Sequence, residues 1–224
     1  MIKQSKAFTV SEVLITLGII GFVIVMTLPN LMKDFQQKIL NNQFKKVYST
    51  INGAILKMRA DLGYYPSCYY GINGKSSTFS ECTSTFYPQL KAELNVAKDC
   101  ANHAYSNGCI PYYNGGDTID PNMTQEDKDK YIASCGGFSQ SGILNSNPAY
   151  ILSDGTIIFM YSNGFAPTFA VDINGMKKPN KWGFDVFALS VYGDGDSFKI
   201  PQGLCGLVEK GGKSTSQMLI NAFK

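Results

Sequence analysis

The sequence has few of the groups on which enzymes and nucleic-acid-binding proteins depend. Its 224 residues include one histidine, His103, and only 17% are charged. It contains no G-x-S-x-G, H-E-x-x-H or phosphate-loop motif, and a Ser-His-Asp or Cys-His site would depend on His103 alone. The net charge is +3, but without Lys3 and Lys6 the count is 18 basic against 17 acidic residues. We therefore predict no enzyme activity, and the nearly neutral body argues against a nucleic-acid partner.

Cysteine pairs at metal-ligand spacing are also missing. All six cysteines follow residue 67 and none forms a C-x-x-C pair, which is unlike the usual zinc ligand clusters. An even number of cysteines after an N-terminal apolar segment favours disulfides in an oxidising compartment over free thiols in a reducing cytoplasm. About fifteen pairings can be drawn, and the sequence does not decide among them. Nearness in sequence favours Cys68–Cys82, Cys100–Cys109 and, by elimination, Cys135–Cys205.

The N-terminal segment is apolar except for one acid. The chain carries no charge from Val13 to Pro29, yet Glu12 stands directly before this run. From Phe8 to Pro29 there are 22 residues, and a membrane-spanning helix needs about 20. The basic leader MIKQSKA should stay in the cytoplasm and direct the following chain outward. A secretory signal would end in an A-x-A-like cleavage site, which MTLPNLMKDF lacks. A plain anchor leaves Glu12 unexplained, because a charge in the bilayer core costs about 3 kcal/mol.

KAFTVSEVLITLGIIGFVIVMTLP resembles the N-terminus of type IV prepilins and type II secretion pseudopilins. In that family a short basic leader ends in a small residue, and a peptidase cuts before a Phe whose new amine is methylated. A Glu lies four residues after that Phe, and a proline commonly lies 21 residues after it. Here these residues are Phe8, Glu12 and Pro29, while Ala7 stands where the family usually has Gly. The resemblance covers residues 1 to about 60.

The resemblance implies cleavage between Ala7 and Phe8 by a prepilin peptidase, methylation of Phe8, and assembly with copies of itself and other pilin-like subunits. It also implies a bacterial inner-membrane protein with one span, whose head lies in the periplasm or, after assembly, at the cell surface. The new amine of one subunit would meet Glu12 of a neighbour, because an unpaired charge in an apolar medium is penalised. The alternative is that Glu12 reaches the membrane interface from the start of its helix.

Beyond Pro29 the pattern continues as an amphipathic helix. Apolar residues recur at steps of three to five as far as Leu62, and lysines, asparagines and glutamines fill the gaps. Residues 8–62 would form one helix about 80 Å long at 1.5 Å per residue, and Gly63 is expected to end it. The apolar positions are Leu31, Phe35, Leu40, Phe44, Val47, Ile51, Ile55, Met58 and Leu62.

The remaining sequence predicts a loop-rich region followed by strands. Residues 63–148 hold five cysteines and are expected to form a disulfide-rich insertion, with short helices from Tyr87 to about Lys98 and from Thr124 to about Ser134. Residues 149–224 are expected to form an antiparallel sheet and a C-terminal tail with a short helix. The strand segments are AYIL, TIIFMYS, FAPTFAVDI and FDVFALSVY, with turns at Ser153-Asp154-Gly155 and Asn174-Gly175.

These regions together predict an α+β fold. A leader (1–7) precedes a long helix with a membrane half (8–29) and an amphipathic half (30–62). A sheet that exposes one apolar face needs cover, and the apolar stripe of the long helix is the available partner. The pilin resemblance implies the same fold.

One head segment invites a metal. VDINGMKKPNKWGFDVF resembles a C-terminal stretch common in pilin-like proteins, and its Asp172, Asn174 and Asp185 suggest calcium, which takes clustered carboxylates and carbonyls. Some pseudopilins carry calcium in a head loop, as the resemblance implies. An EF-hand is excluded because Met176 and Lys177 stand where it needs an acid or Asn and then Gly. The same three residues also suit turns that bond their own backbone. The GDGD turn, with Asp194 and Asp196, is an alternative calcium site.

Two functions of different classes are compatible with these features. The first is a structural subunit of a type IV pilus-like or type II secretion pseudopilus filament. The second is a membrane-anchored extracytoplasmic binding module that does not polymerise. Trp182 and the 13 tyrosines either pack in the core or line a sugar- or surface-binding face of the head.

Overall fold

The computed structural model describes residues 9–63, 82–120, 122, 124–126, 136–161, 168–190, 192–193, 198–199 and 207–223. The chain forms two compact units, residues 1–39 and 40–224, and we call the second unit the head. Several predicted sites lie outside the described residues: Ala7, Phe8, Cys68, Cys135, Asp194, Asp196 and Cys205.

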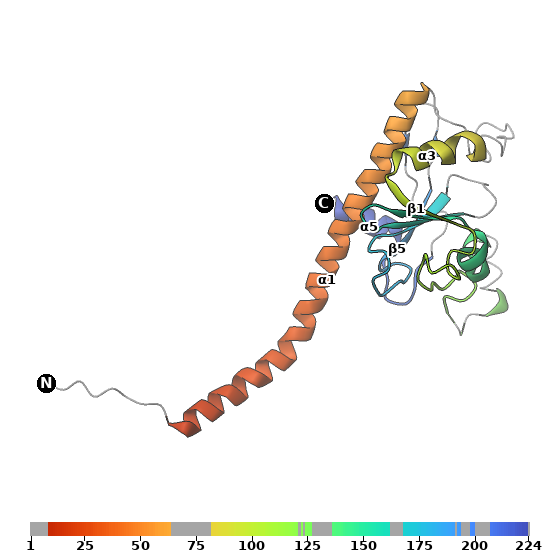
Figure 1. The fold of residues 1–224 in the computed structure, drawn as a ribbon. Coiled ribbons are helices and arrows are strands. Elements are labelled where there is room, and N and C mark those ends of the chain that lie inside the picture. Colours follow the sequence, from red (N-terminus) through yellow and green to blue (C-terminus); the bar gives the residue numbers. More distant parts are fainter. Residues whose placement is uncertain are drawn as a thin grey trace. The chain divides into compact units, whose positions relative to one another are not determined.

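Helix α1 (Val10–Leu62) has 53 residues and contains Pro29 (Figure 1). It agrees with the long helix predicted over 8–62. The segment from Val10 to Pro29 is long and apolar enough to cross a membrane, and its side chains are exposed. The helix ends at Gly63, where φ is +71° and the N–H donates to the Arg59 carbonyl at 3.0 Å. This is the left-handed C-terminal cap that Gly adopts without a steric penalty.

The second unit contains a five-stranded antiparallel sheet in the order β1-β2-β3-β4-β5, which confirms the predicted meander. The four strands expected from the sequence are present, and the two turn glycines have the positive φ that such turns need: +87° at Gly155 and +68° at Gly175. The strands are β1 (Val96–Ala101), β2 (Ala149–Leu152), β3 (Ile157–Met160), β4 (Thr168–Asp172) and β5 (Val186–Ser190).

Strand β1 corrects the sequence interpretation. A helix was expected to continue to about Lys98 within a loop-dominated insertion, but α3 (Tyr87–Glu93) ends before Leu94, which is extended. Asn95 and β-branched Val96 are weak helix formers, and the strand pairs with β2, with Val96 opposite Leu152. A pairing between segments so far apart in sequence outweighed the local helix signal.

Short elements complete this unit. A π-helix, η2 (Cys82–Phe86), leads into α3, and η3 (Gly136–Phe138) and η4 (Gly142–Ser146) precede β2. The segment FDVFALSVY contains β5 and ends at the first residue of β6 (Tyr192–Gly193). Strand β6 pairs with β7 (Phe198–Lys199) in a separate two-stranded sheet. Of the helix expected from Thr124 to about Ser134, residues 124–126 are described: Gln125 and Glu126 are helical and Thr124 is not.

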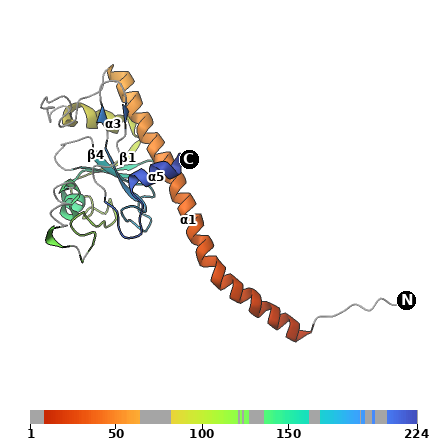
Figure 2. The ribbon, with the colours of Figure 1, turned by 180° about the vertical axis from the view of Figure 1, so that it is seen from behind.

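The tail forms α5 (Thr215–Ala222), as predicted. Ser214 and Gln217 make a capping box: the Gln217 N–H donates to Ser214 Oγ at 3.2 Å, and the Ser214 N–H donates to Gln217 Oε1 at 2.9 Å. Helix α5 lies beside α1 (Figure 2). The ring of Phe223, which follows α5, is 5.3 Å from the ring of Tyr48 in α1.

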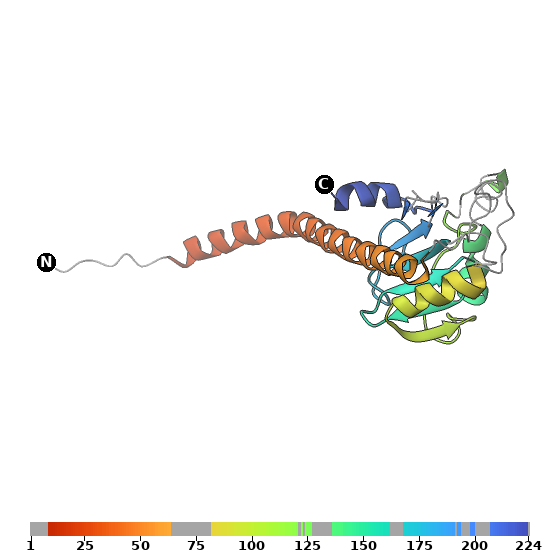
Figure 3. The same cartoon turned by 90° about the horizontal axis from the view of Figure 1, so that it is seen from above.

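The sheet is covered on both faces. Figure 3 shows the sheet together with α3 and α5. On one face, strand side chains pack against α1, α3 and α5, and Phe44 of α1 meets Phe187 of β5 with ring centroids 5.0 Å apart. On the other face, Phe159 of β3 packs with Tyr113, Phe138 and Trp182. The expected cover by the long helix is therefore present. The second face is covered by the segment that contains Ile110 and Tyr113, by η3 and η4, and by the residues around Trp182 and Leu207. The α1 side chains buried in this unit are Phe44, Val47, Ile51, Ala54, Ile55 and Met58.

Candidate functional site

The acid of the apolar segment caps its own helix. Thr9 precedes the first helical residue, and its N–H and Oγ1 both donate to Glu12 Oε2, at 2.9 and 2.8 Å. The Glu12 N–H donates back to Thr9 Oγ1 at 3.3 Å. This reciprocal arrangement is a capping box, which satisfies donors that the first helical turn leaves without partners. A carboxylate at this end of a helix also interacts favourably with the helix dipole.

Thr9 is the site residue that the sequence interpretation missed. A Thr followed three residues later by Glu, directly before an apolar run, is typical of a capping box, so the signal was present. Both Thr9 bonds reach one carboxylate oxygen, Oε2, and among the described residues no bond reaches Oε1 and no cation pairs with Glu12. Glu12 is therefore held in place by its own chain through Oε2, and Oε1 takes no bond from the residues that the structure describes.

The threonines of the apolar segment bond to their own helix. Thr16 Oγ1 donates to the Glu12 carbonyl at 2.9 Å, and Thr27 Oγ1 donates to the Val23 carbonyl at 2.9 Å. A hydroxyl bonded in this way needs no water partner, so it is tolerated in an apolar medium. The segment up to Pro29 is exposed along its whole length, and so large an apolar surface indicates lipid or protein contacts.

In the head, the sheet brings together the three residues proposed for calcium. Asp172 ends β4 and Asp185 precedes β5, and the Ile173 N–H donates to the Asp185 carbonyl at 2.9 Å. Both carboxylates are fully buried. Asn174 lies between them in the turn after β4, and its side chain donates to the Lys178 carbonyl at 3.3 Å.

Hydrogen-bond donors surround both carboxylates. Asp172 Oδ1 accepts from the N–H groups of Asn174 and Gly175, at 3.1 and 2.8 Å, and Oδ2 accepts from Tyr113 Oη at 2.8 Å. Asp185 accepts from the N–H groups of Asn180 and Lys181, at 2.8 and 2.7 Å. Each acid therefore fixes the turn beside it, which is the structural role that the sequence left open.

The same burial controls the protonation of these acids. Burial raises the pKa of Asp172 well above its usual range, and the neighbouring Asp185 raises it further, against the bonds from Tyr113, Asn174 and Gly175. Burial also raises the pKa of Asp185, against the N–H bonds of Lys181 and Asn180. These acids therefore hold protons more tightly than exposed acids do.

These contacts fit turn chemistry better than a calcium site. The described residues contain no group of three or more His, Cys, Asp and Glu side chains that could hold a metal. Among the described buried side-chain atoms of this region, the oxygens without a hydrogen-bond partner are Oδ1 of Asn174 and Oδ1 of Asn180, and both are neutral ligands. Calcium at Asp172, Asn174 and Asp185 stays a prediction.

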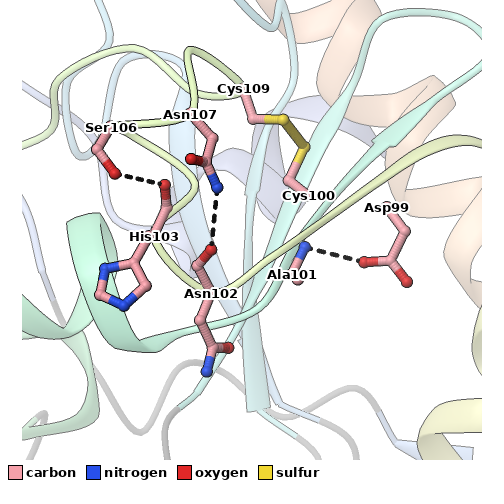
Figure 4. Close-up of a disulfide and its surroundings, with 8 residues drawn as sticks. All are labelled: Asp99, Cys100, Ala101, Asn102, His103, Ser106, Asn107 and Cys109. Atoms are coloured by element: carbon pink, nitrogen blue, oxygen red, sulfur yellow. Dashed lines mark hydrogen bonds between the residues drawn. A yellow bond between two sulfur atoms is a disulfide. The ribbon is translucent and has the colours of Figure 1, made fainter.

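A disulfide closes the loop after β1. Cys100 and Cys109 are joined, with Cα atoms 6.0 Å apart, which is the pairing that nearness in sequence favoured (Figure 4). His103 lies in this loop, exposed and with φ of +59°. Because both sulfurs are in the bond, neither can serve His103 as a nucleophile. The side chain of Cys82 and the three other cysteines lie outside what the structure describes, so their pairings remain predictions.

Comparisons with protein-family models, curated proteins and solved structures find no match to this chain.

Proposed function

We propose that this chain is a structural subunit of a type IV pilus-like or type II secretion pseudopilus filament. A prepilin peptidase would cut before Phe8, and the new amine would be methylated. The observation that carries the proposal is an exposed apolar helical segment of 20 residues with an acid in its first turn. Such a segment needs cover from lipid before assembly and from other subunits afterwards.

The chemistry at Glu12 supports assembly through charge. Its Oε2 is engaged by Thr9, while Oε1 takes no bond from the described residues. The amine of Phe8 on a neighbouring subunit would supply a cation for it, and such a pair is far stronger in an apolar medium than in water. Contacts of this kind are heterologous, because Glu12 of one copy meets a different residue of the next. Repeated without closure, they give an open helical polymer.

The head supports the same proposal. Its α+β architecture, with residues 40–62 of α1 packed on an antiparallel sheet, is the fold that the pilin resemblance implies. The Cys100–Cys109 disulfide suits an oxidising compartment such as the periplasm. We accordingly place the protein in a bacterial inner membrane with one span and an exported head. Its partners would be copies of itself, other pilin-like subunits and the peptidase. The proposed role needs no catalytic group and no nucleic acid.

Mass spectrometry of the full chain purified from membranes tests the processing step. The expected mature protein begins at Phe8 and carries a methyl group on its amine. A chain that begins at Met1, or after residue 30, would contradict the filament proposal. The alternative, an anchored binding module that does not polymerise, would then account for the head and its membrane segment.

Three substitutions separate the charge of Glu12 from its capping role. Glu12→Gln keeps an acceptor for the capping box but removes the charge, and Glu12→Ala removes both. Thr9→Val keeps the charge and weakens the cap by about 1 kcal/mol. We expect both Glu12 variants to insert in the membrane and to form no filaments by electron microscopy, and Thr9→Val to form them. Normal filaments from Glu12→Gln would show that charge pairing is not required.

A further inference from the structure

One asparagine of the head stands in the pattern that oligosaccharyltransferases modify. The pattern is Asn, then any residue except proline, then Ser or Thr, and the sequence contains it once, at Asn122-Met123-Thr124. Because the motif is short, the structural setting decides whether an enzyme can reach the asparagine. An attached glycan is bulky and hydrated, so an acceptor has to lie at the surface.

The structure places this asparagine in an exposed turn. Asn122 and Thr124 are both exposed, and the backbone turns at Asn122. The Asn122 N–H donates to Asp120 Oδ1 at 2.9 Å, which is the bond that an aspartate makes to the backbone two residues later in a turn. The side-chain amide of Asn122 takes part in no hydrogen bond with the part of the chain that the structure describes. The backbone is therefore fixed while the amide faces no competing partner there.

Other asparagines of the head use their amides to hold the fold. The amide of buried Asn147 donates to the Gly137 carbonyl at 2.7 Å. The amide of Asn174 donates to the Lys178 carbonyl at 3.3 Å. Neither asparagine has Ser or Thr two residues later. A sugar on either amide would displace a bond of the fold, whereas a sugar on Asn122 would displace none that the structure describes.

We propose that Asn122 is the acceptor of an N-linked oligosaccharide, supplied by a lipid-pyrophosphate-linked sugar donor. In the transfer, Asn122 Nδ2 forms a bond to the anomeric carbon of the first sugar. The bond from that carbon to the pyrophosphate oxygen breaks, the lipid pyrophosphate leaves with the electron pair, and one amide proton passes to a base of the transferase. No oxidant or reductant is needed.

This inference rests on the export of the head, which is part of the proposed function. The Cys100–Cys109 disulfide supports export without reference to filament formation. A bulky, hydrated group on Asn122 would keep a neighbouring molecule from packing on this turn. The turn would accordingly face solvent in any assembly that the chain forms.

Mass spectrometry of the full chain, purified from the membranes of the cells that make it, tests the proposal. After reduction and digestion, we expect the peptide that contains Asn122 to carry a sugar mass on that residue. The same sample shows which residue begins the chain, so the two proposals are read separately. A sugar on Asn122 of a chain that still begins at Met1 would support this inference and contradict the filament proposal.

Matched variants assign the acceptor. Asn122→Gln and Thr124→Ala should each remove the sugar mass completely, because each destroys the pattern, whereas Thr124→Ser keeps the hydroxyl and should retain the sugar. Asn102→Gln changes an exposed asparagine outside the pattern and should also retain it. The proposal is overturned if Asn122 is unmodified, whichever residue begins the chain. A sugar found on a different residue, or one that persists in Asn122→Gln, would overturn it as well.

Discussion

The two ends of helix α1 differ in what covers them. From Val10 to Pro29 the side chains are exposed, and the segment is apolar on every side of the helix. From Phe44 to Met58 most apolar residues form one stripe that is buried in the head, with Leu56 exposed, while Lys45, Lys46 and Lys57 carry exposed charges. An amphipathic stripe needs one apolar surface, whereas a helix that is apolar all round needs apolar cover on every side. The head therefore has its core without the first segment, and that segment must find its cover elsewhere.

The strongest test of this difference substitutes the same residue type at both ends. Phe44 is 1% exposed and packs on Phe187, whereas Phe22 is 62% exposed. We expect Phe44→Ala to lower the free energy of unfolding of the head by about 3–5 kcal/mol and Phe22→Ala to change it by less than about 0.5 kcal/mol. Denaturant unfolding of the full chain in detergent, followed by near-ultraviolet circular dichroism, measures both. Equal losses from the two variants would show that the first segment belongs to the folded core of the head.

Removing a disulfide should affect the head alone. Cys100→Ala with Cys109→Ala removes a cross-link between residues nine positions apart in the sequence. We expect the loss to lower the free energy of unfolding of the head by about 2–3 kcal/mol, because the unfolded chain gains conformational entropy. Membrane insertion, measured by alkaline extraction, should be unchanged because the loop lies outside the apolar segment. A variant that unfolds at the same denaturant concentration as the unaltered chain would mean that the hydrogen bonds of the loop suffice.

A smaller effect should appear in the pH dependence of head stability. Asp172 and Asp185 have raised pKa values in the folded head, so this contribution is fully present below the ordinary aspartate pKa of about 3.9. It is lost as pH rises through the folded values, with a slope of at most about 1.4 kcal/mol per pH unit for each acid. Asp172→Asn should reduce the loss of head stability with rising pH. Thermal unfolding between about pH 4 and pH 8, above the ordinary aspartate pKa, measures this loss. An unchanged profile would assign the slope to other groups.

The fold was predictable where its signals are local. The turns at Gly155 and Gly175 could be recognised from adjacent residues, and strands β2 to β5 follow from the apolar segments between them. Strand β1 could not be recognised in this way, because its stability comes from pairing with a strand far along the chain. The cover of the second sheet face also depends on contacts between distant parts of the chain, since Phe138 belongs to η3 and Trp182 to the segment before β5.

The candidate sites also differ in whether their contacts are local or long-range in the sequence. Glu12 and its partner Thr9 are three residues apart, and a known capping pattern connects them. The bond between Tyr113 and Asp172 joins residues separated by 59 positions, so only the folded sheet brings them together. The exposure of Tyr105 beside the buried Tyr113 likewise depends on how the disulfide loop docks, which composition cannot supply.

Because the Thr9–Glu12 bonds form within one chain, they exist before any second molecule arrives. If the chain polymerises as proposed, an incoming copy would meet a carboxylate that its own chain already orients, so little conformational entropy would be lost at that contact. The arriving molecule would then not have to wait for the acid to rearrange before its amine could pair with it.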